Sequence, residues 1–217
     1  MCGIAGSLGR PDAVPALVHG LRHRGPDHAG WQTEAGLAVG ASRLRVTGDA
    51  RGDMPLSSTS GNVVVAFNGE IFNHVDLFGG DHGSDVVGLP DLIEREGPAA
   101  LSKIRGPFAL VAFDRRDGSL LVARDEYGVR PLFVHEHGGS VVAASEVTAL
   151  VDQVGPLPRD EIAWDHMLAF QFWPRDRTPW KDVAPVVPGR WYRYVEVGGA
   201  CVREEGVVAY RGGGDDL

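Results

Sequence analysis

The sequence is poor in cysteine, in basic residues and in long apolar runs, and each shortage excludes a class of protein. Two cysteines in 217 residues cannot build a disulfide scaffold or a four-cysteine zinc site. Lys and Arg total 21 against 29 Asp and Glu, and the formal net charge of −8 disfavours binding to nucleic acid or to an anionic membrane surface. No apolar run approaches the roughly 20 residues that span a bilayer, and the N-terminus lacks the pattern of a signal peptide. We therefore expect a cytoplasmic protein with one domain, 1–210, and a flexible tail, 211–217.

Strand signals dominate the chain. A β-branched apolar run, 63–67, ends at Asn68-Gly69. Three further pairs of apolar runs flank turns that contain glycine, which predicts hairpins: 108–113 with 120–123, 132–134 with 141–144, and 191–197 with 201–208. Apolar spacing and capping residues predict helices over 13–21, 84–96 with a kink at Pro90, 98–104, 145–150 and 160–170. Hairpins interspersed with separated helices predict an α+β fold with antiparallel sheets.

Cys2 is the first candidate for a catalytic residue. If Met1 is removed, the Cys2 thiol lies on the same residue as a free α-amine, whose usual pKa of about 7.7–8.0 allows it to accept the thiol proton near neutral pH. One residue would then supply both nucleophile and base. The alternative is a chance cysteine at a frayed terminus. The small apolar residues 3–6 favour a buried strand, which would hold Cys2 firmly.

Three other positions carry groups that suit a polar substrate. The Asn68 amide and the Gly69 backbone N–H could stabilise an oxyanion, or the pair could form a plain turn. Arg43 interrupts an otherwise apolar segment, 37–46, so it either binds a carboxylate or reaches solvent from an edge strand. Asp85 could bind an ammonium group or cap a helix.

The remaining polar groups give weaker signals. His135 and His137 share one face of a predicted strand, but the sequence offers no evident third ligand, so we expect no metal. The turn-rich segment 22–27 is either a mobile loop over a site or a solvated connection. Cys201 lies in the last hairpin and is expected to pack as an ordinary apolar side chain.

Together these fragments resemble the class II glutamine amidotransferases, which are N-terminal nucleophile hydrolases, and above all the N-terminal glutaminase domain of asparagine synthetase. The resemblance covers residues 1 to about 197. Its matching stretches follow the family's order: 1–6, 22–27, 43–46, 68–74, 83–85, 106–109, 123–132 and 144–146. It implies a four-layer αββα sandwich, in agreement with the predicted hairpins.

The resemblance also implies a reaction. Cys2 would attack the side-chain amide of L-glutamine and form a thioester, with its own α-amine as the base. Asn68 and the Gly69 N–H would form the oxyanion hole. The products would be glutamate and ammonia.

The same resemblance implies how the substrate is held. Arg43 would bind the α-carboxylate of glutamine, near backbone groups of Val46 and Thr47. Glu70 and Asp85 would bind its α-ammonium group.

The expected partner is a separate enzyme. The chain has no Ser-Gly-Gly-x-Asp pyrophosphate loop, so we expect no cofactor here and ATP only in an amide-forming partner similar to asparagine synthetase. Two alternatives are a catalytically inactive scaffold of the same fold and an N-terminal nucleophile hydrolase of another amide. An aromatic-rich region either contacts the partner or closes the core: Trp164, Met167, Phe170, Phe172, Trp173 and Trp180.

Overall fold

Two antiparallel sheets form the centre of the protein. The computed structural model describes residues 1–46 and 48–209. The first sheet contains β1 (Gly3–Leu8), β2 (His28–Glu34), β3 (Leu37–Arg43), β8 (Phe133–His137), β9 (Ser140–Ala144) and β10 (Val183–Pro185), in the order β10-β8-β9-β1-β3-β2. The second contains β4 (Leu56–Ser57), β5 (Val63–Gly69), β6 (Phe108–Asp114), β7 (Ser119–Arg124), β11 (Arg190–Val197) and β12 (Ala200–Val207), in the order β12-β11-β7-β6-β5-β4.

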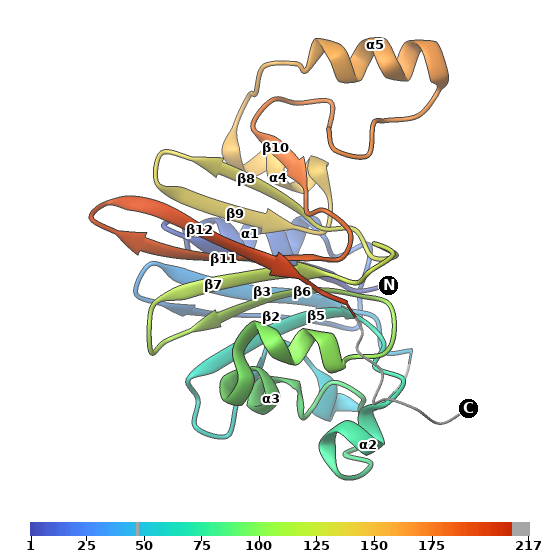
Figure 1. Cartoon of the computed structure of the whole chain (residues 1–217), viewed down its shortest axis with the longest axis vertical. Coiled ribbons are helices and arrows are strands. Elements are labelled where there is room, and N and C mark those ends of the chain that lie inside the picture. The colour runs from blue at the N-terminus through green and yellow to red at the C-terminus, as the bar shows by residue number, and fades with distance from the viewer. Residues whose placement is uncertain (47, 210–217) are drawn as a thin grey trace.

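Helices cover the outer faces of both sheets. Helices α1 (Ala13–Gly20) and α4 (Val147–Val154) pack on the first sheet, and α3 (Leu89–Glu96) packs on the second. The resulting order is helix, sheet, sheet, helix, which confirms the predicted α+β sandwich of four layers. Shorter elements lie in the connections: η1 (Ala50–Gly52), α2 (His74–Phe78) and η2 (Gly97–Lys103). Helix α5 (Glu161–Phe170) projects from one end of the sandwich (Figure 1).

Strand β1 is buried on both of its faces. Ile4 belongs to the apolar core between the two sheets, whereas its neighbour Ala5 belongs to the core between the first sheet and helices α1 and α4. Successive side chains of a strand point to opposite faces, so a strand covered on both sides reads as a continuous small apolar run. β1 pairs with β3 on one side and with β9 on the other. The residue directly before it, Cys2, is therefore attached to one of the most enclosed strands of the fold.

The predicted hairpins are confirmed, and three of the helix predictions are wrong in detail. β6 pairs with β7, β8 with β9, and β11 with β12. The helix expected from Ser84 begins only at Leu89, so Pro90 lies in its first turn and causes no kink. Residues 97–103 form a 3-10 helix, and the helix expected over 145–150 spans Val147–Val154.

Two expectations concern the surroundings and the end of the chain. No helix in the described residues is long and apolar enough to cross a membrane. The domain boundary expected at 210 and the flexible tail expected at 211–217 fall on residues outside those described.

Candidate active site

A pocket of about 140 Å³ lies where β1 begins and where β3 and β5 end. It collects seven of the eight predicted site residues; the eighth, Thr47, lies outside the described residues. The lining consists of Met1, Cys2, Arg43, Leu44, Val46, Met54, Phe67, Asn68, Gly69, Glu70, Ser84, Asp85, Val86 and Arg130. Groups from segments far apart in the sequence thus converge on the thiol.

Cys2 is held in place by the strands around it. Its Sγ lies 3.9 Å from the Leu44 carbonyl oxygen, and its own carbonyl accepts a hydrogen bond of 3.1 Å from Arg24 Nε. Two residues along, Ile4 exchanges hydrogen bonds with Ser145: its N–H donates to the hydroxyl, and its carbonyl accepts from the Ser145 N–H. The alternative of a cysteine on a frayed terminus is therefore wrong.

The segment 22–27 contacts Cys2, the residue directly before β1. Arg24 Nη1 donates to Glu146 at 2.8 Å while its Nε holds the Cys2 carbonyl. Burial alone would raise the pKa of Glu146, but hydrogen bonds from Arg24 and His23 lower it below its usual value. A Cβ at Gly25 would lie 2.3 Å from the Ser42 carbonyl oxygen, so only glycine permits this close approach. Arg24 and Gly25 therefore anchor the segment against Cys2 and β3, while its other residues are exposed.

Asn68 and Gly69 are the last two residues of β5 and form no plain turn. They pair with Ala109 and Phe108 of β6. Asn68 is 1% exposed, and its Nδ2 is buried without a hydrogen-bond partner among the residues that the structure describes. A Cβ at Gly69 would lie 2.2 Å from the Pro107 carbonyl oxygen. The pocket therefore contains an amide donor that lacks an acceptor, next to a position restricted to glycine.

Arg43 ends a central strand and does not reach solvent from an edge. β3 lies between β1 and β2, and Arg43 is 4% exposed. Its Nη1 donates to the Asp49 carbonyl at 2.7 Å and to Asp53 Oδ1 at 2.8 Å. Hydrogen bonds from Arg45 and then Arg43 lower the pKa of Asp53 to about 2, although partial burial opposes them. The guanidinium is thus fixed at the pocket wall by a carboxylate that stays ionised.

Two carboxylates line the same pocket on other segments. Asp85 accepts a hydrogen bond of 2.8 Å from the Ile71 N–H through Oδ2. It caps no helix, because α3 begins later and has Gly88 as its N-cap residue. Glu70 follows β5 directly and is exposed. Two guanidinium groups, those of Arg43 and Arg130, and two carboxylates therefore line one small pocket, which suits a ligand with charges of both signs such as an amino acid.

Several lining residues were not foreseen from the sequence. Arg130 contacts Met1 Sδ through Nη1 at 2.9 Å, and its Nε is buried without a partner in the described part of the chain. Met54 lines the pocket and accepts from the Phe67 N–H through Sδ at 3.1 Å. Arg130 lies in the matching stretch 123–132, but the sequence assigned it no role. Only the folded chain places it beside the N-terminus.

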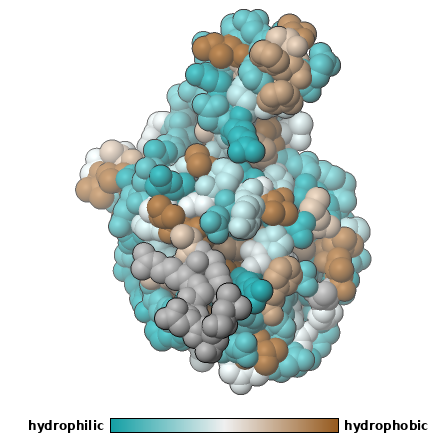
Figure 2. Space-filling model, turned by 45° about the vertical axis from the view of Figure 1, so that its right-hand side comes forward, coloured by the Kyte–Doolittle hydropathy of each residue, from teal (hydrophilic) through white to brown (hydrophobic). Residues whose placement is uncertain are grey.

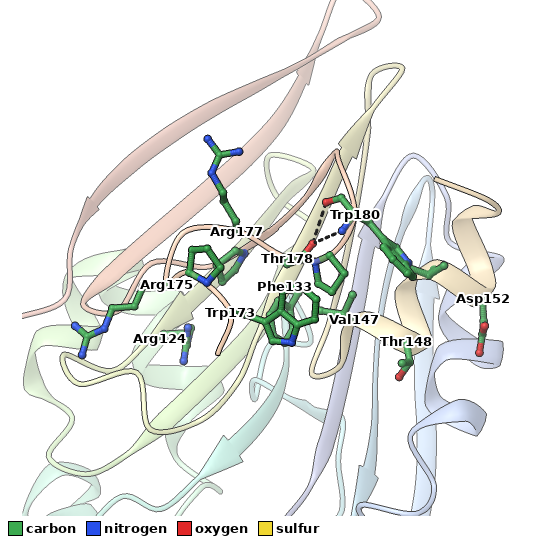
Figure 3. Close-up of a pocket in the computed structure, with 14 residues that line it drawn as sticks. Arg124, Phe133, Val147, Thr148, Asp152, Trp173, Arg175, Arg177, Thr178 and Trp180 are labelled. Carbon is green, nitrogen blue, oxygen red and sulfur yellow. Dashed lines mark hydrogen bonds between the residues drawn. The ribbon is translucent and has the colours of Figure 1, made fainter. Parts of the chain in front are cut away.

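A larger apolar cleft, of about 570 Å³, lies elsewhere, between α4, β8 and the segment 173–180. Figure 3 shows Trp173 near Phe133 and Val147 in its centre, while the guanidinium groups of Arg175 and Arg177 point away. Its lining includes no cysteine, whereas the smaller pocket contains Cys2, so we assign the chemistry to the smaller pocket. No group of three or more His, Cys, Asp and Glu side chains among the described residues could hold a metal ion.

Comparison with known proteins agrees with this assignment. Residues 1–203 match the family model described as glutamine amidotransferase domain. The chain belongs to this family. It is 36% identical over 166 residues to an asparagine synthetase [glutamine-hydrolyzing] of Sandersonia aurantiaca, covering 70% of this chain and 32% of that protein. Asparagine synthetase [glutamine-hydrolyzing] 2 of Lotus japonicus is 37% identical over 166 residues, which cover 70% of this chain and 28% of that protein.

A solved structure supports the fold of this amidotransferase domain. The glutamine phosphoribosylpyrophosphate amidotransferase from B. subtilis, complexed with ADP and GMP, matches with a TM-score of 0.66 and 22% identity over 94% of this chain and 49% of that one. The chain thus spans about half of this structural neighbour and about a third or less of the curated relatives it matches. The predicted family, fold and enzyme class are confirmed.

Proposed function

We propose that this domain hydrolyses L-glutamine to L-glutamate and ammonia through a thioester on Cys2. The observation that carries the proposal is the convergence of Cys2, the unpartnered amide of Asn68 and the buried Arg43 on one pocket, all within the described residues. Arg43 would bind the α-carboxylate of the substrate, and Asp85 and Glu70 would bind its α-ammonium group. The pocket therefore suits an amino acid with a side-chain amide.

Each step of the reaction has a group to perform it. Once Met1 is removed, the Cys2 α-amine takes the thiol proton and the sulfur attacks the amide carbon. Asn68 Nδ2 and the Gly69 N–H stabilise the oxyanion, and the α-ammonium returns the proton to the departing nitrogen, which leaves as ammonia. Water, deprotonated by the amine, then attacks the thioester carbonyl. Glutamate leaves and the Cys2 thiol is restored.

The two cysteines provide a matched test. Cys2→Ala should abolish glutamine hydrolysis, since losing a nucleophile removes most of the rate, whereas Cys201→Ala, in β12, should keep it. Glutaminase assays, with thermal melting to show that both variants fold, decide the matter. Hydroxylamine added to the wild type should also divert product to glutamyl hydroxamate, which reports a thioester.

The same assays address the two alternative functions. An inactive scaffold has no use for a buried amide, unpartnered among the described residues, beside a cysteine, and such a chain would hydrolyse no glutamine. A hydrolase of another amide would act on amides that lack the α-amino acid group. In the proposed function, Arg43 and Asp85 recognise that group, so such amides should react slowly. Near-wild-type activity of the Cys2→Ala variant would contradict the mechanism altogether.

We further propose that the ammonia passes to a separate, ATP-dependent amide-forming partner similar to asparagine synthetase. The support is that the curated relatives are glutamine-hydrolysing asparagine synthetases, of which this chain covers about a third or less. Ammonia alone does not form an amide with an unactivated carboxylate, so the partner must supply the activation. The test is the glutaminase rate with and without a purified synthetase-type protein of the same source and its carboxylate substrate.

The segment 160–180, here called the arm, is the surface that we expect such a partner to contact. Three of the six residues in its predicted aromatic region are half-buried and pack on one another: Trp164 packs edge-on against Trp173 at 5.2 Å and stacks on Trp180 at 6.2 Å, measured between ring centroids. Of the other three, Met167 is half-buried, whereas Phe170 and Phe172 are exposed, as are Ile162 and Leu168 on the same segment. Figure 2 shows hydrophobic residues gathered on the projecting arm. Exposed apolar patches of this kind are typical of interfaces.

Paired substitutions test the arm. Phe170→Ser with Phe172→Ser should weaken association with the synthetase-type protein and leave the basal glutaminase rate unchanged. Val202→Ser, at an exposed position of β12, is the control for lost apolar surface. Equal association of all three proteins would assign the contact to another surface.

A further inference from the structure

The carboxylate of Asp53 sits at the meeting point of three cationic or ionisable side chains. Its Oδ1 accepts from Arg43 Nη1 at 2.8 Å and from Arg45 Nε at 2.9 Å, and Arg45 Nη2 donates to Oδ2. His28 Nδ1 lies 3.6 Å from Oδ2. Asp53 lies ten residues after Arg43, behind the short helix η1, and its own N–H donates to the Ala50 carbonyl at 3.0 Å.

These contacts fix the orientation of the Arg43 guanidinium. Arginine carries large rotamer freedom, so an arginine that must meet a planar carboxylate gains affinity when its guanidinium is oriented beforehand. Arg43 Nη1 is held by both the Asp49 carbonyl and the Asp53 carboxylate. The packing is tight, because a Cβ on Gly52 would lie 2.6 Å from Arg43 Nη2.

The charges around Asp53 explain why its ion pair with Arg43 does not cancel the attraction of Arg43 for a substrate carboxylate. One carboxylate faces two guanidinium groups, those of Arg43 and Arg45, so the triad keeps a positive charge. The nearby Asp49 carboxylate is directed elsewhere: it pairs with Arg51, through Nη2 at 2.8 Å. Of these two carboxylates, Asp53 is the one bonded to the Arg43 side chain.

We infer that Asp53 is a positioning residue, which orients Arg43 for the α-carboxylate of the substrate and thereby sets selectivity for α-amino acid amides. The inference rests on the proposed function, which makes Arg43 the carboxylate-binding group. Asp53 touches no reacting atom. Its effect is on substrate binding and not on the chemistry at Cys2.

The experiment compares four proteins in glutaminase assays: wild type, Asp53→Asn, Arg43→Lys and the double variant. Asp53→Asn should raise KM for glutamine about tenfold and leave kcat within about twofold. Arg43→Lys should also raise KM at least tenfold. If Asp53 acts through Arg43, the double variant should be little worse than Arg43→Lys alone, because the orientation is lost once the guanidinium is gone.

A substrate analogue distinguishes lost orientation of Arg43 from general damage to the pocket. The inhibition constant of 4-aminobutanamide, which is glutamine without its α-carboxylate, should be the same for wild type and Asp53→Asn. Asp160→Asn is the control, because its carboxylate also pairs with an arginine at 2.8 Å and is 13% exposed against 15% for Asp53. That variant should change neither KM nor the inhibition constant.

The outcomes distinguish failure of this inference from failure of the proposed function. The role of Asp53 would be overturned if the KM of the double variant rose by the product of the two single effects, or if Asp53→Asn left KM unchanged. Either result would leave the role of Arg43 in substrate binding intact. An inhibition constant for 4-aminobutanamide that rises in parallel with KM would also overturn it. An unchanged KM in Arg43→Lys would instead remove Arg43 from substrate binding, and with it the premise.

Discussion

The amide nitrogen of Asn68 is buried without an acceptor in the wall of the pocket that Cys2 lines, at least among residues 1–46 and 48–209. Buried polar groups in folded proteins are nearly always hydrogen-bonded, so an unpartnered amide in a pocket indicates a site that a ligand completes. Strands of the two packed sheets hold both residues: Asn68 is part of β5 in the second sheet, and Cys2 directly precedes β1 in the first. The donor thus stands ready before any oxyanion forms.

Asn68→Ala should therefore reduce turnover far more than stability. Losing one oxyanion donor lowers kcat by about 10²–10³-fold. The thermal midpoint should change little, because no hydrogen bond to Nδ2 is lost among the described residues. Steady-state glutaminase assays and thermal melting measure the two quantities.

Asn62→Ala is the control at the opposite end of the same strand. Asn62 Nδ2 donates to Glu94 at 2.8 Å, outside the pocket, so this variant should lose stability and keep kcat. If Asn68→Ala retained wild-type kcat, the buried amide would have no role in the reaction.

Retention of Met1 should inactivate the domain. Met1 lines the pocket and contacts Arg130, so it occupies space that the substrate needs, and its peptide bond converts the Cys2 amine into a non-basic amide. An uncleaved N-terminal tag should have the same effect, with at least a hundredfold loss of turnover. Intact-mass measurement of active protein should show a chain that begins at Cys2. Full turnover by a tagged chain would exclude the α-amine as the base.

The sequence predicted the elements whose pattern is local. Continuous apolar runs beside glycine turns indicated the three hairpins, and the spacing of Val14, Leu17 and Val18 indicated α1. Strand β2 was missed because it lies at an edge of the first sheet and is largely exposed, so it has no apolar run. The start of α3 was misplaced because Ser84 and Asp85 resemble a cap, whereas Asp85 bonds the Ile71 N–H.

The candidate site divides in the same way. The residues to which we assign the chemistry could be proposed from motifs and from a resemblance to a known family, because each lies in a short recognisable stretch. The residues that hold them in place could not be identified in this way. Asp53 and Arg130 reach the site through tertiary packing, and no periodicity links Asp53 to Arg43 across the loop between them.

Gly69→Ala should damage both stability and activity. The added Cβ would lie 2.2 Å from the Pro107 carbonyl and 2.8 Å from Phe108 Cα, which are backbone atoms with no room to move. Overpacking of this kind costs about 1–3 kcal/mol, and the strand end that we propose as the oxyanion hole would shift. Urea unfolding and kcat measure the two effects.

Gly20→Ala is the matched glycine control. Gly20 ends helix α1, and the nearest neighbour of a Cβ added there would be Ala149 Cβ at 3.9 Å, an ordinary contact distance. Alanine in a helix is more favourable than glycine by about 0.5–1 kcal/mol, so this variant should be at least as stable as wild type and fully active. A stable, active Gly69→Ala protein would show that β5 and β6 separate more easily than their packing indicates.

The ion pairs of Asp53 should make part of the stability depend on pH. Hydrogen bonds from Arg45 and Arg43 lower the pKa of Asp53 to about 2, below the value of about 3.9 expected in the unfolded chain. A carboxyl group with a lowered folded pKa contributes stability above its unfolded pKa and loses it as the pH falls toward the folded value. Asp53→Asn should therefore have a lower melting temperature than wild type at pH 5–7, and the two melting temperatures should converge between pH 4 and 2.

A partly solvent-screened pair is worth up to about 1 kcal/mol, or roughly 2–4 °C in the melting temperature of a protein of this size. Asp176→Asn, at an exposed carboxylate without an ion pair in the described part of the chain, should show no such convergence. A difference between Asp53→Asn and wild type that stayed constant down to pH 2 would mean that the carboxylate's charge is not what stabilises this loop.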